Sequence, residues 1–140
     1  MPRPRVQEVR RSQKKSLYLH ELSRFVQQIA YDEPAVARLF MTRVELSRDG
    51  GMCYVYFSAY GAQDEASRRA AFEEARPVLV LYKPSLRKAF GDMLQGRYVP
   101  DLRFVFDAQK EKEMRINDLL QKVSDELAAL SPQEKADEEE

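Results

Sequence analysis

The side chains in this sequence that are best suited to chemistry are clustered cations. Within the first fifteen residues, the basic side chains are opposed by a single acid, Glu8, and a second basic cluster occupies residues 83–97. Guanidinium and ammonium groups contact nucleic-acid phosphates and supply affinity without reading the bases. Ordinary solvated surface is the alternative for such clusters. The cations predicted to bind RNA phosphates are Arg3, Arg5, Arg10, Arg11, Lys83, Arg87, Lys88 and Arg97.

Other reactive side chains are isolated. His20 is the single histidine, and a lone histidine within a helix is more often a packing or surface residue than a catalyst. Cys53 falls on the apolar face of a predicted strand, which favours a buried, unreactive thiol. With no second cysteine, an internal disulfide is excluded and a zinc site lacks ligands. Gly50 and Gly51 belong to a hairpin turn, not to a phosphate-binding loop. The sequence therefore predicts no enzyme activity, no metal and no cofactor.

The second basic cluster belongs to a helix that is joined to a strand. Apolar residues recur at helical spacing across residues 86–94, while Arg87 and Lys88 fall elsewhere on the helix. Gly96 is suited to end this helix because glycine tolerates positive φ. Residues 102–106 then alternate with a period of two. This pattern predicts a strand with one buried face.

A first helix and a hairpin precede this unit. Residues 5–30 carry an intermittent apolar stripe and predict a helix, whose basic first half needs the rest of the domain or a partner to become ordered. Residues 42–47 and 52–59 alternate on either side of a Gly-Gly turn and predict two antiparallel strands. Tyr54 and Tyr56 share the more exposed face, where they are suited to stack on bases. Ordinary strand preference is the alternative explanation for these tyrosines.

Prolines divide the middle of the chain. Residues 63–76 are rich in Ala, Glu and Arg and predict a helix. Pro77 and Pro84 each lack the amide proton that a helix interior uses. We therefore expect an interruption of the central helix at one of these two positions. The apolar segment 78–82 between them is compatible with a buried helix or with an extended link.

The C-terminal segment differs from the rest of the chain in charge. Through Val105 the chain has 18 Lys and Arg against 12 Asp and Glu, whereas from Phe106 onward it has 5 against 11. Residues 109–130 place apolar residues at helical spacing and predict an amphipathic helix. Residues 131–140 predict a disordered acidic tail, which we expect to shield the basic surface.

Length and composition indicate one globular domain. The chain has 140 residues, of which 44% are hydrophobic and 33% charged. No apolar run approaches the roughly 20 residues that cross a bilayer, and the first residues lack the apolar core of a secretion signal. We therefore expect a cytoplasmic protein with no membrane partner.

Several short stretches, taken in order, carry a family resemblance. They are residues 3–6 (RPRV), 44–49 (VELSRD), 55–56 (VY), 86–87 (LR), 97–104 (RYVPDLRF), 115–116 (RI) and 119–120 (LL). By these stretches the chain resembles the ribosome-binding factor A family, bacterial factors that mature the small ribosomal subunit. Their order and spacing together make the resemblance specific.

The resemblance implies a fold and a function. It implies a KH-like (type II) domain over residues 1–108 that binds ribosomal RNA, includes the basic N-terminal arm and lacks a Gly-x-x-Gly loop. It further implies a monomeric, non-enzymatic factor that binds free or immature 30S subunits and contacts 16S rRNA. Such a factor would assist late maturation and 16S rRNA processing, most importantly in the cold. The family's Ala-x-Gly break between the central helices is replaced here by proline.

Together the elements predict an α+β fold. We expect a three-stranded sheet packed by helices on one face, an interrupted central helix and a C-terminal helix. The alternative function is a protein-interaction module that dimerises or docks a partner through the helix at 109–130. A sequence-specific binder of single-stranded RNA is a third hypothesis, which the missing Gly-x-x-Gly loop disfavours.

Overall fold

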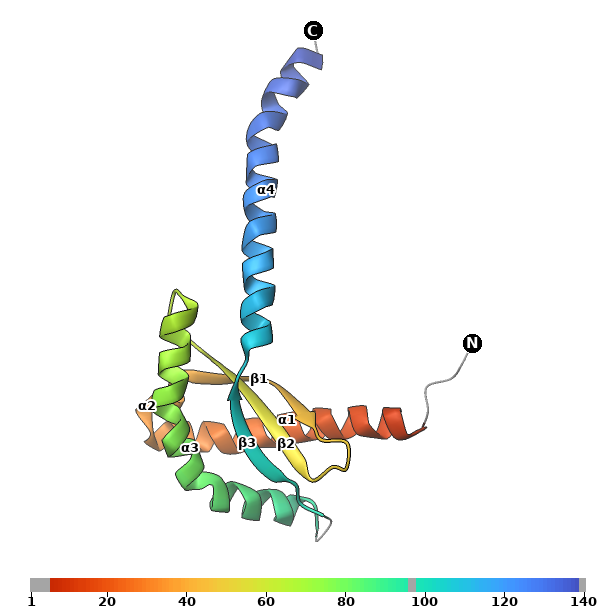
Figure 1. Ribbon diagram of the computed structural model, residues 1–140, viewed down its shortest axis with the longest axis vertical. Coiled ribbons are helices and arrows are strands. Elements are labelled where there is room, and N and C mark those ends of the chain that lie inside the picture. Colours follow the sequence, from red (N-terminus) through yellow and green to blue (C-terminus); the bar gives the residue numbers. More distant parts are fainter. Residues whose placement is uncertain (1–5, 96–97, 139–140) are drawn as a thin grey trace. The chain divides into compact units, whose positions relative to one another are not determined.

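The computed structural model of the chain (Figure 1) describes residues 6–95 and 98–138. Arg3, Arg5 and Arg97, which were predicted to bind RNA, lie outside the described residues. The chain divides into two units, Met1–Asp107 and Ala108–Glu140. The elements in order are α1 (Val6–Asp32), α2 (Pro34–Ala37), β1 (Leu39–Leu46), β2 (Met52–Ala59), α3 (Glu65–Met93), β3 (Asp101–Phe106) and α4 (Ala108–Glu138).

The first unit is organised around a three-stranded sheet with the order β1-β2-β3. β1 and β2 form an antiparallel hairpin in which Val44 lies opposite Val55. β2 runs parallel to β3, with Val55 opposite Phe104. Parallel neighbours need a long crossover connection, and α3 provides it. The predicted α+β architecture with three strands is confirmed.

One face of the sheet forms the core together with α1 and α3. In β2 the side chains of Cys53, Val55 and Phe57 are at most 1% exposed, as their period of two predicted. Burial of a large apolar side chain contributes about 1.5–3 kcal/mol, so this layer fixes the helices on the sheet. The helices supply Tyr18, Leu22, Val26 and Ile29 from α1 and Phe72, Leu79, Leu86 and Phe90 from α3.

The central helix is continuous, so the predicted interruption at Pro77 or Pro84 is wrong. α3 runs from Glu65 to Met93 with both prolines inside it. Each proline removes one helical hydrogen bond, and α3 changes direction along its length (Figure 1), as proline-containing helices commonly do. The ambiguous segment 78–82 is helical, and Leu79 within it is fully buried. Core packing along α3 thus keeps the segment helical, and the prolines bend it instead of breaking it.

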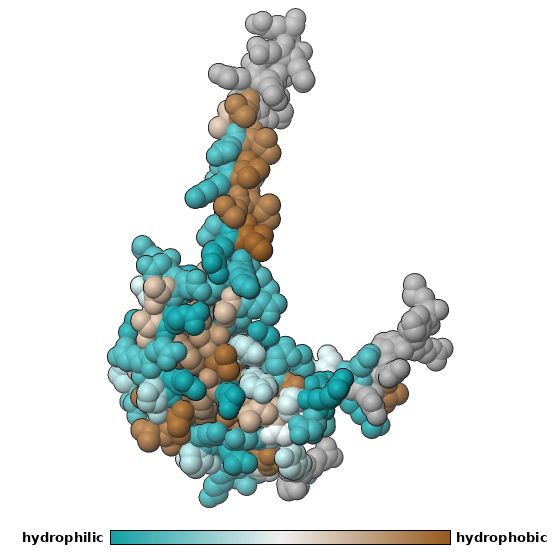
Figure 2. All heavy atoms as spheres, viewed as in Figure 1, coloured by the Kyte–Doolittle hydropathy of each residue, from teal (hydrophilic) through white to brown (hydrophobic). Residues whose placement is uncertain are grey.

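The second unit is the helix α4. Its aliphatic side chains form a stripe, which Figure 2 shows in brown along the helix. These side chains are 52–62% exposed: Ile116, Leu119, Leu120, Val123, Leu127 and Leu130. α4 extends to Glu138, past the end predicted at residue 130. The helix thus overlaps most of the segment predicted to be a disordered acidic tail, and the division of the chain at residue 130 stays a prediction.

Candidate nucleic-acid interface

The turn between β1 and β2 is a well-defined structure that presents one cation. The Asp49 carboxylate accepts hydrogen bonds from the Gly51 amide (2.9 Å) and the Ser47 hydroxyl (2.8 Å). These bonds hold the pKa of Asp49 below its ordinary value. Gly50 has a φ of +76°, a conformation that favours glycine. These hydrogen bonds therefore fix the backbone of the turn. Arg48, which lies between Ser47 and Asp49, is exposed.

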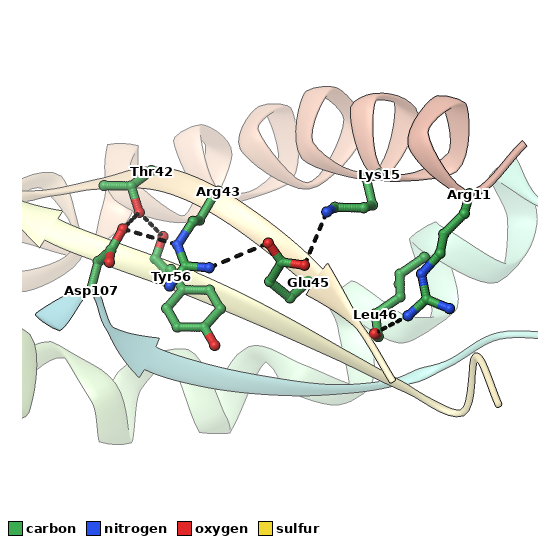
Figure 3. Close-up of polar contacts among 8 residues, drawn as sticks. All are labelled: Arg11, Lys15, Thr42, Arg43, Glu45, Leu46, Tyr56 and Asp107. Carbon is green, nitrogen blue, oxygen red and sulfur yellow. Dashed lines mark hydrogen bonds and ion pairs between the residues drawn. The ribbon is translucent and has the colours of Figure 1, made fainter. Parts of the chain in front are cut away.

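The basic first half of α1 is attached to this hairpin. Arg11 donates from one guanidinium nitrogen to the carbonyl oxygens of Leu46 and Ser47, the latter at 3.1 Å. One turn further along α1, Lys15 Nζ lies 3.0 Å from Glu45 Oε2 in β1 (Figure 3). The sequence predicted that this half of α1 needs other parts of the domain or a partner to become ordered. The hairpin is the part of the domain that contacts this half of α1, and Arg10, which is exposed, lies beside the hairpin turn.

The second basic group reaches the same end of the sheet through Asp101. Lys83 Nζ lies 2.9 Å and Arg87 Nε 3.9 Å from the Asp101 carboxylate. The hydrogen bond from Lys83 is the main cause of a lowered Asp101 pKa. The Asp101 amide in turn donates to the Gly51 carbonyl oxygen at 3.0 Å. Lys83 and Arg87 are therefore joined to the hairpin turn by one carboxylate, and the three side chains together carry one net positive charge.

The structure thus gathers part of the predicted set. Arg10 and Arg11 from α1 lie beside the turn at residues 47–51, which we call the hairpin end, and Lys83 and Arg87 from α3 are attached to the same turn through Asp101 at the start of β3. Lys88 is exposed on α3, and it makes no ion pair within the described part of the chain. The sequence predictions omitted Arg48, although its position in a Gly-Gly turn signals an exposed side chain.

The more exposed face of the sheet carries a polar network instead of two open aromatic rings. The Arg43 guanidinium lies 3.8 Å from the centroid of the Tyr56 ring, so one face of that ring is already covered (Figure 3). Arg43 is also 3.3 Å from Glu45 and 3.4 Å from Asp107. Base stacking by Tyr56 would therefore use its other face or displace Arg43.

Asp107 closes the network at the end of β3. Its side chain is 3% exposed and accepts a hydrogen bond of 2.6 Å from the Thr42 hydroxyl. The Asp107 amide donates to the Phe57 carbonyl oxygen at 2.9 Å. A buried carboxylate needs such partners because an unpaired charge inside a protein lowers its stability by about 3–5 kcal/mol. Asp107 therefore fastens β3 and β1 together rather than facing a ligand.

Groups that would support catalysis are dispersed. Cys53 is fully buried, as predicted, and burial raises the pKa of its thiol to about 12, which disfavours the reactive thiolate. His20 lies exposed on α1. Within residues 6–95 and 98–138, no three His, Cys, Asp or Glu side chains gather as they would around a metal ion. None of the helices in this described part is both long and apolar enough to cross a membrane.

Comparisons with known proteins identify related sequences. A family model described as "Ribosome-binding factor A" matches residues 10–120. A protein of that name from Halothermothrix orenii is 32% identical over 94 residues, covering 67% of this chain and 72% of the relative. Another from Alcanivorax borkumensis is 31% identical over 114 residues, covering 81% of this chain and 79% of the relative.

Solved structures of similar proteins come from Thermus thermophilus. The crystal structure of its ribosome-binding factor A is 23% identical, covers 67% of this chain and 92% of that one, and superposes with a TM-score of 0.47. A homology model of the same factor, fitted into the cryo-EM map of its complex with 30S, is 26% identical with a TM-score of 0.41. It covers 64% of this chain and 86% of that chain.

Proposed function

The chain belongs to the ribosome-binding factor A family, and from this membership we propose that it binds the small ribosomal subunit through the phosphates of its RNA. The matched region, residues 10–120, contains the whole sheet, α3 and the hairpin end. The family name refers to the ribosome, and the resemblance to this family implies 30S subunits and their 16S rRNA as the binding partner.

One observation carries the choice of surface. Two basic groups that lie far apart in the sequence are both attached to the hairpin end: Arg11 bonds to the carbonyls of Leu46 and Ser47, and Lys83 and Arg87 pair with Asp101, whose amide bonds to Gly51. A convergent set of cations is what a phosphate backbone requires, and such contacts supply most sequence-independent affinity. In this proposal the phosphate contacts come from Arg10, Arg11, Lys83, Arg87 and Lys88, with Arg3, Arg5 and Arg97 outside the described residues.

The proposed role is that of a non-catalytic assembly factor. We place it in the cytoplasm, as a monomer that binds free or immature 30S subunits and assists late maturation and 16S rRNA processing. Growth in the cold is the condition in which we expect its loss to matter most. The dispersed positions of Cys53 and His20 agree with a binding function rather than a catalytic one.

Sedimentation of cell extract on a sucrose gradient tests the proposal. The chain should travel with free small subunits and be absent from polysomes. Washing at raised salt should release it, because phosphate contacts weaken as counterions compete. A chain that stays at the top of the gradient at low salt, or that travels with polysomes, would contradict the proposed function.

A second candidate function rests on the aliphatic stripe of α4. Six aliphatic side chains on this helix are 52–62% exposed, which is more apolar surface than a solvated helix needs. This favours a protein partner or a second copy of the chain. Ribonuclease treatment of material captured with the tagged chain separates the two functions, since a protein partner remains bound and ribosomal components held through RNA are lost.

A further inference from the structure

A cleft of about 520 Å³ lies between the first half of α1 and the hairpin turn. One wall is the exposed basic side of α1 and the other is the backbone and side chains of the turn. The residues lining it are Glu8, Arg10, Arg11, Lys14, Leu46, Ser47, Arg48, Asp49 and Gly50. Neither Lys14 nor Arg48 belongs to the set of RNA-binding residues predicted from the sequence.

The charges in this cleft are unbalanced. Four cations face two carboxylates, and the Asp49 carboxylate is already bonded to the Gly51 amide and the Ser47 hydroxyl. Arg10, Lys14 and Arg48 have no ion-pair partner within the described part of the chain. Like charges brought together without partners repel, and an anion between them relieves that repulsion. The cleft is therefore matched to an anionic ligand.

Arg11 has a different part in this cleft. One of its guanidinium nitrogens donates to the carbonyl oxygen of Leu46 (Figure 3) and to that of Ser47, and thereby ties the α1 wall to the turn wall. A guanidinium has five N–H donors in a fixed planar arrangement. The remaining donors stay available after these bonds form. Arg11 thus sets the separation between the cations of α1 and Arg48.

We propose that this cleft binds the phosphodiester backbone of the RNA, with Arg10, Lys14 and Arg48 contacting phosphate oxygens, and that Arg11, in addition to the phosphate contact proposed above, is a positioning residue that holds the two walls together. The proposal rests on the proposed function and assigns it a specific site. A free mononucleotide is a poorer ligand, because none of the described residues lining the cleft is aromatic and a base would have no stacking surface. A backbone phosphate needs only the cations.

Equilibrium binding of the full chain to purified 30S subunits across a series of KCl concentrations tests the site. K14Q/R48Q removes two cleft cations, and R76Q/K122Q is the matched control because Arg76 on α3 and Lys122 on α4 are also exposed. Each lost phosphate contact lowers the slope of log K against log salt by about 0.7–0.9. We expect the slope of K14Q/R48Q to fall by about 1.4–1.8, with a loss of affinity on the order of tenfold to a hundredfold at 0.1 M salt.

The outcomes separate the two proposals. If the unmodified chain fails to bind 30S subunits, the proposed function is wrong. If it binds and K14Q/R48Q behaves like R76Q/K122Q, the cleft is not a phosphate site, while the proposed function stands on the Lys83 and Arg87 group.

The positioning role of Arg11 is tested in the same assay with R11K, which keeps the charge but loses the bridge to two carbonyls. We expect R11K to weaken binding in the unmodified chain and to have no further effect in the K14Q/R48Q background. A merely structural role would give the same loss in both backgrounds and would overturn the assignment.

Discussion

The two units of this chain use their apolar side chains in opposite ways. In the first unit, Phe57, Leu79 and Phe90 are 0% exposed within one core. In α4, aliphatic side chains of similar size are 52–62% exposed along one stripe. The first unit therefore takes its stability from burial, whereas the stripe of α4 presents apolar surface that a solvated helix does not need. The contrast separates the buried residues that maintain the fold of the first unit from the exposed residues of α4 that are available to a binding partner.

The largest effect is expected from truncating the core. Phe57 is fully buried and lies 6.1 Å, centroid to centroid, from both Phe72 and Phe104. Phe57→Ala should lower the free energy of unfolding by about 3–5 kcal/mol, and Leu127→Ala in α4, where the side chain is 62% exposed, by no more than about 0.5 kcal/mol. Urea denaturation followed by circular dichroism measures both. Equal losses in the two variants would show that the α4 stripe is as deeply involved in folding as the core.

The same contrast applies to carboxylates. Asp107 is 3% exposed and accepts hydrogen bonds from Thr42 and Arg43, whereas Asp125 in α4 accepts one bond from Gln121 at an exposed position. Asp107→Ala should cost about 1–3 kcal/mol because it leaves the half-buried Thr42 hydroxyl and Arg43 guanidinium short of an acceptor. Asp125→Ala should cost a few tenths of a kcal/mol, roughly the value of an exposed helix pair. Thermal unfolding of both variants is the measurement, and a larger loss for Asp125→Ala would contradict the difference in burial.

The fold was predictable where a pattern depends on near neighbours along the chain. The alternation of Cys53, Val55 and Phe57 identified the buried face of β2, because successive strand residues must point to opposite sides. The behaviour of Pro77 and Pro84 was not predictable in this way. Whether a proline ends a helix or bends it depends on the packing of the helix around it, and the burial of Leu79 comes from residues distant in sequence.

The candidate site shows the same limit. Clustered cations were visible in the sequence, and the second group was placed correctly on a helix before β3. Their convergence was not visible, because it depends on contacts such as Arg11 with Leu46, which are separated by 35 residues. Tyr56 was assigned to the more exposed face correctly, but its contact with Arg43 follows from a cross-strand pairing of β1 with β2.

Charge reversal extends the comparison to binding. R87E/K88E changes two exposed side chains of α3, and K112E/K122E changes two exposed side chains of α4. The α3 variant should lower 30S affinity on the order of tenfold to a hundredfold at 0.1 M salt and reduce the salt slope by about 2, since each phosphate contact adds nearly 1. The α4 variant should bind almost as the unmodified chain does. Co-sedimentation with 30S subunits is the measurement, and equal losses would place α4 in the interface.

The smallest expected effect concerns the acidic end of the chain. Residues 131–140 contain five Asp and Glu and one Lys, and this charge opposes that of the basic first unit. Deleting residues 131–140 should raise RNA affinity severalfold at low salt. The gain should disappear as the Debye length falls to about 8 Å at physiological ionic strength. D137N/E138Q/E139Q/E140Q keeps the length and removes most of the charge, so filter binding to 16S rRNA should give it nearly the same gain. A gain from the deletion alone would indicate that the segment acts through its bulk, and no gain from either variant would show that it does not shield the basic surface.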